Sequence, residues 1–136
     1  MSEGRCVLTR LGQTLVVTLE GAVDSSCLES ASDALSEENT RLGADSVVFE
    51  VSACDLIDFE EFIRFRKLIQ TMDFLGLRSV VAGLTPGTVA YLASAGVSCE
   101  GLHTSLDLEH ALSDLNANSE HYENVEYDGS DDVGPL

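Results

Sequence analysis

The side chains with the clearest potential for chemistry are two carboxylates, Asp55 and Asp58, which follow the apolar run at residues 46–52. Carboxylates just beyond the carboxyl end of a strand lie where open α/β sheets place their ligand sites. A receiver domain uses such carboxylates to hold a magnesium ion and to accept phosphate. It also needs a lysine at the end of a later strand, and the single lysine, Lys67, falls in the middle of a predicted helix. The sequence therefore argues against a receiver site.

Asp58 is also placed to begin a helix, because Glu61 follows it at the spacing of a capping box. A phosphate on the residue after Asp58 would be stabilised by free backbone N–H groups and by the positive end of the helix dipole. The alternative is that Asp58 acts only as a helix cap, which contributes on the order of 1 kcal/mol. Both interpretations fit the spacing, and the residue types alone favour the cap.

No catalytic constellation is recognisable in the sequence. It contains no GxGxxG or Walker loop and no GxSxG nucleophile elbow. The histidines are expected in a loop, on a polar helix face and near the chain end, in the order His103, His110 and His121. The cysteines stand singly in or beside apolar stretches, at Cys6, Cys27, Cys54 and Cys99. We therefore expect no catalytic residues, no metal site, no cofactor, and buried cysteines in a reducing cytoplasm.

The chain is strongly acidic, with 24 Asp and Glu against 7 Lys and Arg and a formal net charge of -17. Such a surface repels phosphate backbones and anionic lipid, so nucleic acid and membranes are poor candidates for partners. A basic protein partner fits better, although acidity also serves solubility alone. No apolar run reaches the roughly 18 residues of a membrane span, and no signal segment begins the chain. We expect a cytoplasmic protein.

The 136 residues are enough for one α/β domain. Short apolar runs favour strands, and longer segments repeat their apolar residues at helical spacing. The predicted order is ββαβαβαβα, with strands at 6–12, 14–21, 46–52, 78–84 and 97–102 and helices at 24–42, 59–75, 85–96 and 105–115. This alternation implies a mostly parallel, mixed sheet of about five strands with about four helices, and the opening hairpin adds an antiparallel edge. Residues 116–136 lose the pattern and lack Lys and Arg, so we expect a disordered acidic tail.

The segment from Asp55 to Leu112 resembles the STAS domains of sigma-factor antagonists, in particular the RsbS and RsbR types of the stressosome. Four features carry the likeness: Asp-Leu-Ile-Asp at 55–58, Leu-Gly at 75–76, Val-Val-Ala-Gly-Leu-Thr-Pro at 80–86, and Ser-Leu-Asp-Leu-Glu-His-Ala-Leu at 105–112. The strand and helix order agrees from residue 6 to residue 115. The resemblance implies a STAS domain at residues 1–115, followed by the tail.

Such a domain is expected to be non-catalytic and to act in partner-switching signalling. The resemblance implies that it assembles with RsbR-type STAS proteins into an oligomer and binds an RsbT-type serine/threonine kinase. In the family, the phosphoacceptor is a Ser or Thr directly after an aspartate that precedes the second helix, and that position here is Phe59. Three interpretations compete: an antagonist or scaffold that is never phosphorylated, permanent charge from Glu60 and Glu61, or a lost switch whose Phe59 packs against a partner. We prefer the first and third together.

The predicted partner interface and switch region contains eight residues: Asp55, Asp58, Phe59, Glu60, Arg64, Lys67, Thr85 and Thr88. Arg64 and Lys67 would run down the outer side of the helix beside the loop at 85–88, either to meet an acidic partner or to neutralise nearby glutamates. Ser52, Thr85 and Thr88 are possible substitute acceptors. A STAS subunit that regulates a lipid-transport ATPase, or another ligand-linked STAS domain, is the alternative function.

Overall fold

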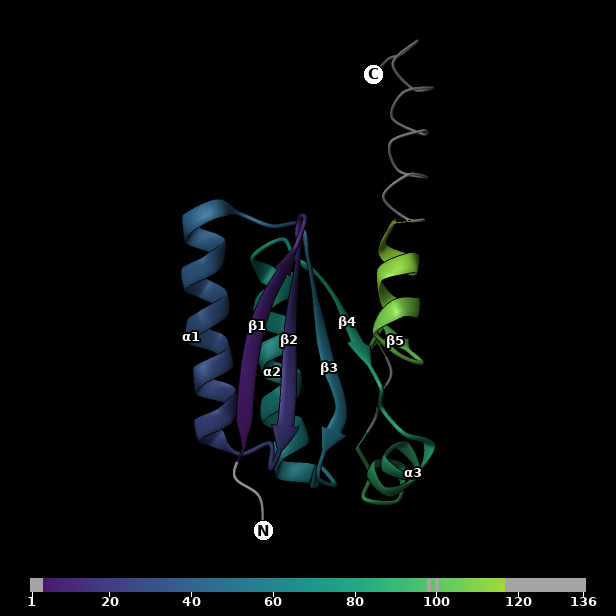
Figure 1. Cartoon of the computed structure of the whole chain (residues 1–136). Coiled ribbons are helices and arrows are strands. Elements are labelled where there is room, and N and C mark those ends of the chain that lie inside the picture. The colour runs from purple at the N-terminus through teal and green to yellow at the C-terminus, as the bar shows by residue number, and fades with distance from the viewer. Residues whose placement is uncertain (1–3, 98, 100, 117–136) are drawn as a thin grey trace.

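The computed structural model describes residues 4–97, 99 and 101–116. Strands and helices alternate along the chain after an opening hairpin (Figure 1). The elements are β1 (Arg5–Leu11), β2 (Thr14–Gly21), α1 (Ser25–Leu42), β3 (Ser46–Cys54), α2 (Phe59–Phe74), β4 (Arg78–Ala82), α3 (Pro86–Ser94) and β5 (Thr104–Ser105). A last helix follows at residues 108–116. This arrangement confirms the predicted element order.

The five strands form one sheet in the order β1-β2-β3-β4-β5. The hairpin of β1 and β2 is antiparallel, and every later pair is parallel. The mixed, mostly parallel sheet predicted from the sequence is therefore confirmed. Its central strand β3 is buried on both faces along most of its length, as expected for a strand with helices on either side.

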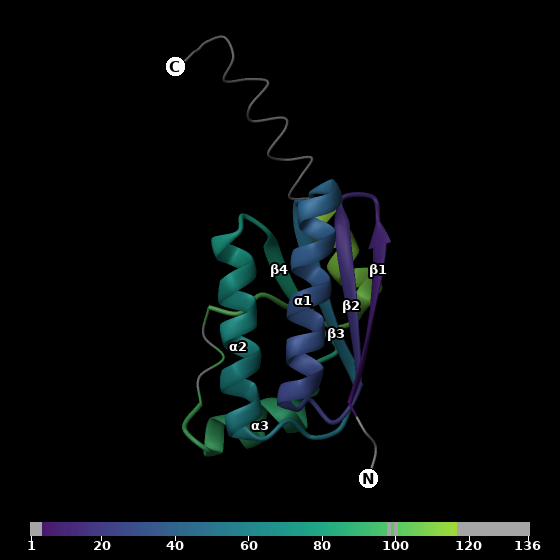
Figure 2. The same cartoon turned by 90° about the vertical axis from the view of Figure 1, so that its left-hand side faces the viewer.

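Helices cover both faces of the sheet, but unequally. In Figure 2, α1 and α2 lie side by side on one face. They enclose a core of twenty buried residues that includes Phe49 of β3, whose ring meets that of Phe65 edge-to-face at 5.3 Å between centroids. The last helix packs on the other face, where a second core contains Val16, Val48, Val80, Ala82, Ala111 and Leu115. The domain thus has one large and one small hydrophobic layer.

The helices begin where the sequence places caps. Asp24 accepts a hydrogen bond from the Cys27 amide at the start of α1, and Gly43 ends that helix. Thr85 caps α3, with Pro86 as its first residue, where a missing N–H costs nothing. These side chains satisfy backbone donors that a helix leaves free in its first turn.

The predicted strand at 97–102 is wrong, because the fifth strand is Thr104–Ser105. Val97 instead closes α3, since its amide donates to the Leu92 carbonyl. Positions 98 and 100 lie outside the described residues, and the other positions of the predicted strand are not in a strand. The sheet contact comes later, where the amide of Val81 in β4 donates to the His103 carbonyl.

The last helix also begins later than predicted, at residue 108 rather than 105. Asp107 accepts from the His110 amide at 2.9 Å and so acts as its cap. Leu106, within the predicted helix range, lies before the observed helix and is 77% exposed. The expected tail at 116–136 falls outside the described residues, apart from position 116, which ends the described part of the helix.

Candidate functional site

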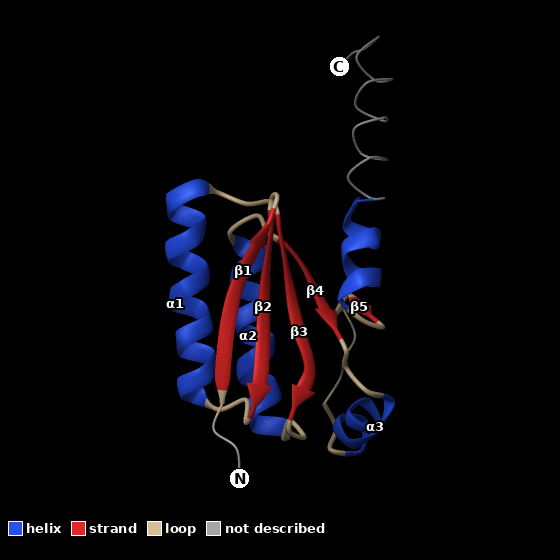
Figure 3. Ribbon diagram, viewed as in Figure 1, coloured by secondary structure: helices blue, strands red, loops and turns tan. Residues whose placement is uncertain are grey.

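The carboxyl ends of β3 and β4 bring two loops together at one end of the sheet (Figure 3). Between them lies a shallow cavity of about 230 Å³. Its lining includes four of the residues that the sequence singled out: Ser52, Asp55, Thr85 and Thr88. The backbone amide of Asp55 donates to the carbonyl of Gly21 at 2.8 Å, which ties this loop to the end of β2. Parallel strand ends thus converge here as the sequence predicted.

Gly83 allows the two loops to approach closely. Its φ is 89°, and a Cβ at this position would lie 2.8 Å from the Ser52 Cβ and 2.9 Å from the Ser52 amide nitrogen. Real Cβ atoms do not come so close to backbone, so any larger residue would push β3 and the loop after β4 apart. The shape of the cavity therefore depends on glycine at this position.

The start of α2 is closed by the predicted capping box. The Asp58 carboxylate accepts from the Glu61 amide at 2.8 Å, and the Glu61 carboxylate accepts from the Asp58 amide at 3.3 Å. Glu60 and Glu61 both lie in the first turn, where negative charge is favoured by the helix dipole. The Phe59 side chain is 43% exposed directly after the cap. An exposed aromatic ring therefore occupies the position at which the resemblance to STAS domains implies a hydroxyl group.

Phe59 is part of a small exposed apolar surface that sequence reasoning missed. Leu56 in the preceding loop is 60% exposed, and Ile63, one turn later on α2, is 40% exposed. Phe59 and Ile63 are four residues apart, so they lie on the same side of the helix. The sequence did contain a signal for this surface: Ile63 is apolar but lies outside the buried stripe of α2 that contains Phe62 and Phe65. Exposed apolar groups gathered in this way are typical of interaction surfaces.

The hydroxyl groups near this surface already have partners. The Ser52 hydroxyl donates to the Glu50 carboxylate at 2.8 Å. The Thr85 hydroxyl accepts from the Thr88 amide at 3.1 Å and lies 3.0 Å from the Thr88 hydroxyl. The structure therefore gives the three possible substitute acceptors roles in local hydrogen bonding.

Arg64 and Lys67 lie on a different side of α2 from the cavity. Both line a groove of about 350 Å³ between α1 and α2, together with Glu29 of α1. In the part of the chain that the structure describes, neither side chain makes an ion pair. The eight predicted residues thus fall into three neighbouring groups: the cavity, the start of α2, and this groove.

The titratable groups near the cavity do not favour nucleophilic chemistry. Burial, with smaller contributions from the nearby Cys27 thiol and Glu50 carboxylate, raises the pKa of the Cys54 thiol to about 12. A thiol with this pKa stays protonated at neutral pH, and the thiolate is the nucleophilic form. Among residues 4–97, 99 and 101–116, no three His, Cys, Asp or Glu side chains gather as a metal site. Within the same residues, no helix has the length and apolar character needed to cross a membrane.

Known proteins with the same architecture are anti-sigma-factor antagonists and their relatives. A variant of RsbS from Moorella thermoacetica, with glutamate in place of one serine, matches with a TM-score of 0.73 and 22% identity, over 85% of this chain and 98% of that chain. A structure titled as the molecular architecture of the stressosome, a signal integration and transduction hub, matches with a TM-score of 0.67 and 19% identity, over 83% and 98%. The unphosphorylated anti-sigma factor antagonist SpoIIAA matches with a TM-score of 0.61 and 13% identity, over 82% and 97%.

Comparison with models of protein families finds no match, and comparison with curated protein sequences finds none either. The structural matches each extend over nearly the whole of the known chain. At these sequence identities, such likeness is evidence of a shared fold. This chain therefore has the STAS fold, in the form found in RsbS and other anti-sigma-factor antagonists.

Proposed function

We propose that this protein is a non-catalytic STAS interaction module of the RsbS type, which acts in the cytoplasm as a scaffold or antagonist in partner switching. Its partners would be RsbR-type STAS proteins and an RsbT-type serine/threonine kinase. The structural likeness to RsbS over 98% of that chain supports the module. The observation that carries the specific proposal is the exposed Phe59 at the start of α2.

Phenylalanine has no hydroxyl group, so Phe59 cannot accept phosphate. The carboxylates of Glu60 and Glu61 place negative charge in the same turn, but each carries about half the charge of a phosphoryl group and sits differently. A constitutively unphosphorylated scaffold fits these residues better than a permanent phosphate mimic. Its regulation would then lie in its partners rather than in this chain.

The surface around Phe59 has the composition of a partner contact. An exposed aromatic with neighbouring aliphatic groups at Leu56 and Ile63 supplies the apolar centre. Arg64 and Lys67, in the neighbouring groove between α1 and α2, supply cations without ion pairs among the described residues. Aromatic anchors contribute disproportionately to binding energy, so Phe59 is the residue at which the interface is most sensitive to truncation.

The test is reconstitution with the RsbR-type and RsbT-type proteins of the same genome, followed by sizing and by mass spectrometry after incubation with ATP. We expect a large complex that retains the kinase while this subunit stays unphosphorylated. Phe59→Ala should weaken kinase retention by about tenfold or more. Phe74→Ala is the matched control, because Phe74 lies at the other end of α2 and is 94% exposed.

Phe59→Ser should restore a phosphoacceptor, so the variant subunit should gain one phosphate and release the kinase. If Phe59→Ala and Phe74→Ala retain the kinase equally, the start of α2 is not the contact. If the chain binds neither partner, the stressosome-type function is wrong. A regulator of a lipid-transport ATPase would then be the function to test next.

A further inference from the structure

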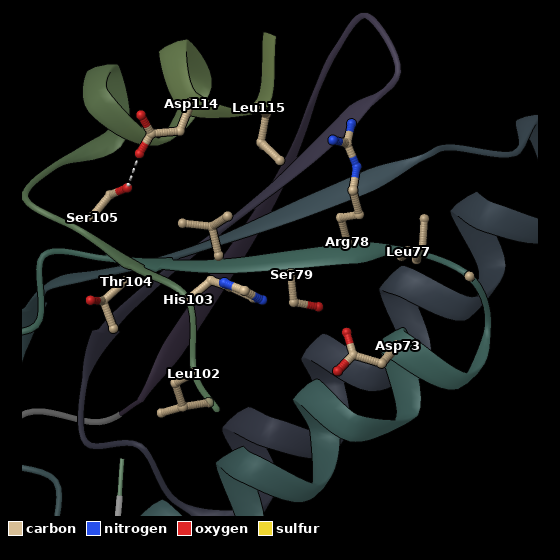
Figure 4. Close-up of a pocket in the computed structure, with 12 residues that line it drawn as sticks. Asp73, Leu77, Arg78, Ser79, Leu102, His103, Thr104, Ser105, Asp114 and Leu115 are labelled. Atoms are coloured by element: carbon tan, nitrogen blue, oxygen red, sulfur yellow. Dashed lines mark hydrogen bonds between the residues drawn. The ribbon is translucent and has the colours of Figure 1, made fainter. Parts of the chain in front are cut away.

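A larger cavity runs along the outer edge of β4, away from the start of α2 (Figure 4). Its volume is about 810 Å³. Asp73 of α2 lies on one side of the strand, and Asp114 and Leu115 of the last helix lie on the other. The floor between them is β4 itself, from Arg78 to Val80. The cavity thus opens onto the edge of the sheet.

This edge is open because β5 is only two residues long. β5 pairs with Val81 and Ala82, and among the described residues no strand pairs with the first half of β4 on that side. The Val81 amide points outward, since it donates to the His103 carbonyl. Backbone groups alternate in direction along a strand. The N–H and C=O of Ser79, two residues before Val81, therefore also point outward, away from β3. Among the described residues, no backbone hydrogen bond joins Ser79 to a neighbour there.

The side chain of Ser79 lacks a partner as well. Ser79 is 6% exposed, and its hydroxyl oxygen is the one buried side-chain oxygen or nitrogen without a hydrogen bond in the described part of the chain. An unsatisfied buried hydroxyl costs roughly 1–3 kcal/mol, so such groups usually mark a missing partner. Figure 4 shows this side chain on the side of the strand that faces Asp73. One residue of β4 thus offers a backbone donor, a backbone acceptor and a hydroxyl group beside one cavity.

The charges around the edge favour a basic occupant. The carboxylates of Asp73 and Asp114 flank the strand on its two sides, against the single guanidinium of Arg78. The chain as a whole has a formal net charge of -17, which attracts cationic segments from a distance. The opposite edge differs, because β1 places Arg5 and Arg10 along its length, and charged side chains discourage strand addition.

We propose that the edge of β4 binds an extended, basic segment of a partner protein, which adds a strand beside Ser79. Backbone pairing to the Ser79 N–H and C=O would supply the affinity of this mode of recognition. Along the added strand, a lysine or arginine would face Asp73, and the next residue, being apolar, would face Val80 and Leu115. This surface lies in the first half of β4, so the inference does not depend on the proposed kinase contact.

The test uses the isolated full chain and a synthetic peptide, acetyl-Thr-Lys-Val-Lys-Val-Thr-amide. Amide hydrogen exchange measured by NMR should be fast at Ser79 and slow at Val80 in the free protein, because only the Val80 amide points toward β3. Saturating peptide should slow exchange at Ser79. Asp73→Asn should weaken binding roughly two- to fivefold, as expected for loss of one partly exposed charge pair. Asp33→Asn on the exposed face of α1 is the matched control and should change nothing.

Two further peptides separate strand addition from charge attraction alone. A version with glutamate in place of lysine, and one with N-methyl groups on the backbone of the valines, should both fail to slow exchange at Ser79. The proposal is overturned if millimolar lysine peptide leaves Ser79 unprotected, or if either modified peptide binds equally well. It is also overturned if Ser79 is already protected in a free protein that sizing shows to be a dimer, because a second copy would then occupy the edge.

Discussion

Replacing Gly83 by alanine should destabilise the domain more than the same change at Gly76. Both glycines have nearly the same φ, 89° at Gly83 and 88° at Gly76. They differ in their surroundings: a Cβ at Gly76 would meet nothing within 4 Å, whereas a Cβ at Gly83 would lie 2.8 Å from the Ser52 Cβ. The pair thus separates the cost of crowding from the cost of an unfavourable φ.

The expected magnitudes follow from these two costs. A non-glycine residue with positive φ costs roughly 1–2 kcal/mol, partly offset by about 0.4–1 kcal/mol because alanine restricts the unfolded chain. Gly76→Ala should therefore lower the free energy of unfolding by about 1 kcal/mol. Crowding against packed backbone adds roughly 1–3 kcal/mol, so Gly83→Ala should lower it by about 2–4 kcal/mol.

Urea denaturation of the two variants and the parent chain, followed by circular dichroism, measures both values. An equal slope of the free energy of unfolding against urea concentration in all three proteins would show that each exposes the same amount of surface on unfolding. If the two substitutions cost the same, the close approach between Gly83 and Ser52 does not exist in solution. The reasoning about the cavity between the ends of β3 and β4 would then be wrong.

Four further variants and one labelling experiment test the remaining structure. Asp58→Ala should lower the free energy of unfolding by about 1 kcal/mol in urea, and an unchanged value would contradict its capping role. Leu115→Ala should cost about 2–5 kcal/mol because the side chain is buried, whereas the exposed Leu106→Ala should cost less than about 0.5 kcal/mol; equal costs would refute this packing. Deleting residues 117–136 should leave the thermal midpoint nearly unchanged, and a large decrease would show that they stabilise the fold. Because burial raises the pKa of Cys54 to about 12, iodoacetamide should label it far more slowly in the native state than in urea, and equal rates would contradict that burial.

Elements that depend on local chemistry could be predicted from the sequence. The start of α2 is an example, because Asp58 and Glu61 carry a capping box in their own spacing. The buried face of the same helix can be predicted from its apolar residues, which recur at helical intervals. These residues pack against α1 and β3 in the larger core. In such cases the residues that specify the element are the residues within it.

The fifth strand could not be predicted in this way. Thr104 and Ser105 have no apolar pattern, and they become a strand only because the carboxyl end of β4 offers hydrogen-bonding groups there. The apolar run at 97–102 resembles a strand locally, yet Val97 is used to end α3. Pairing between distant segments decided this element, and a single sequence does not reveal that pairing.

The candidate site likewise combines features that the local sequence predicts with features that depend on packing between distant segments. The exposed position of Phe59 could be predicted, because it follows directly from the helix start. The separation of Arg64 and Lys67 from Thr85 could not, since it depends on how α2 is rotated against α1. The open edge at Ser79 depends on the length of β5, and no local pattern at Ser79 indicates it.

The unequal layers on the two faces of the sheet imply unequal local stability. Among the described residues, the core between the last helix and the sheet contains six buried residues, against twenty beneath α1 and α2. Regions that bury little apolar surface open at a lower free energy than the whole domain. The last helix should therefore detach more readily than α1 or α2, and its amides should exchange through an opening that leaves α1, α2 and β1–β4 intact. Because Leu115 lines the cavity beside β4, each such opening would also uncover that edge of the sheet.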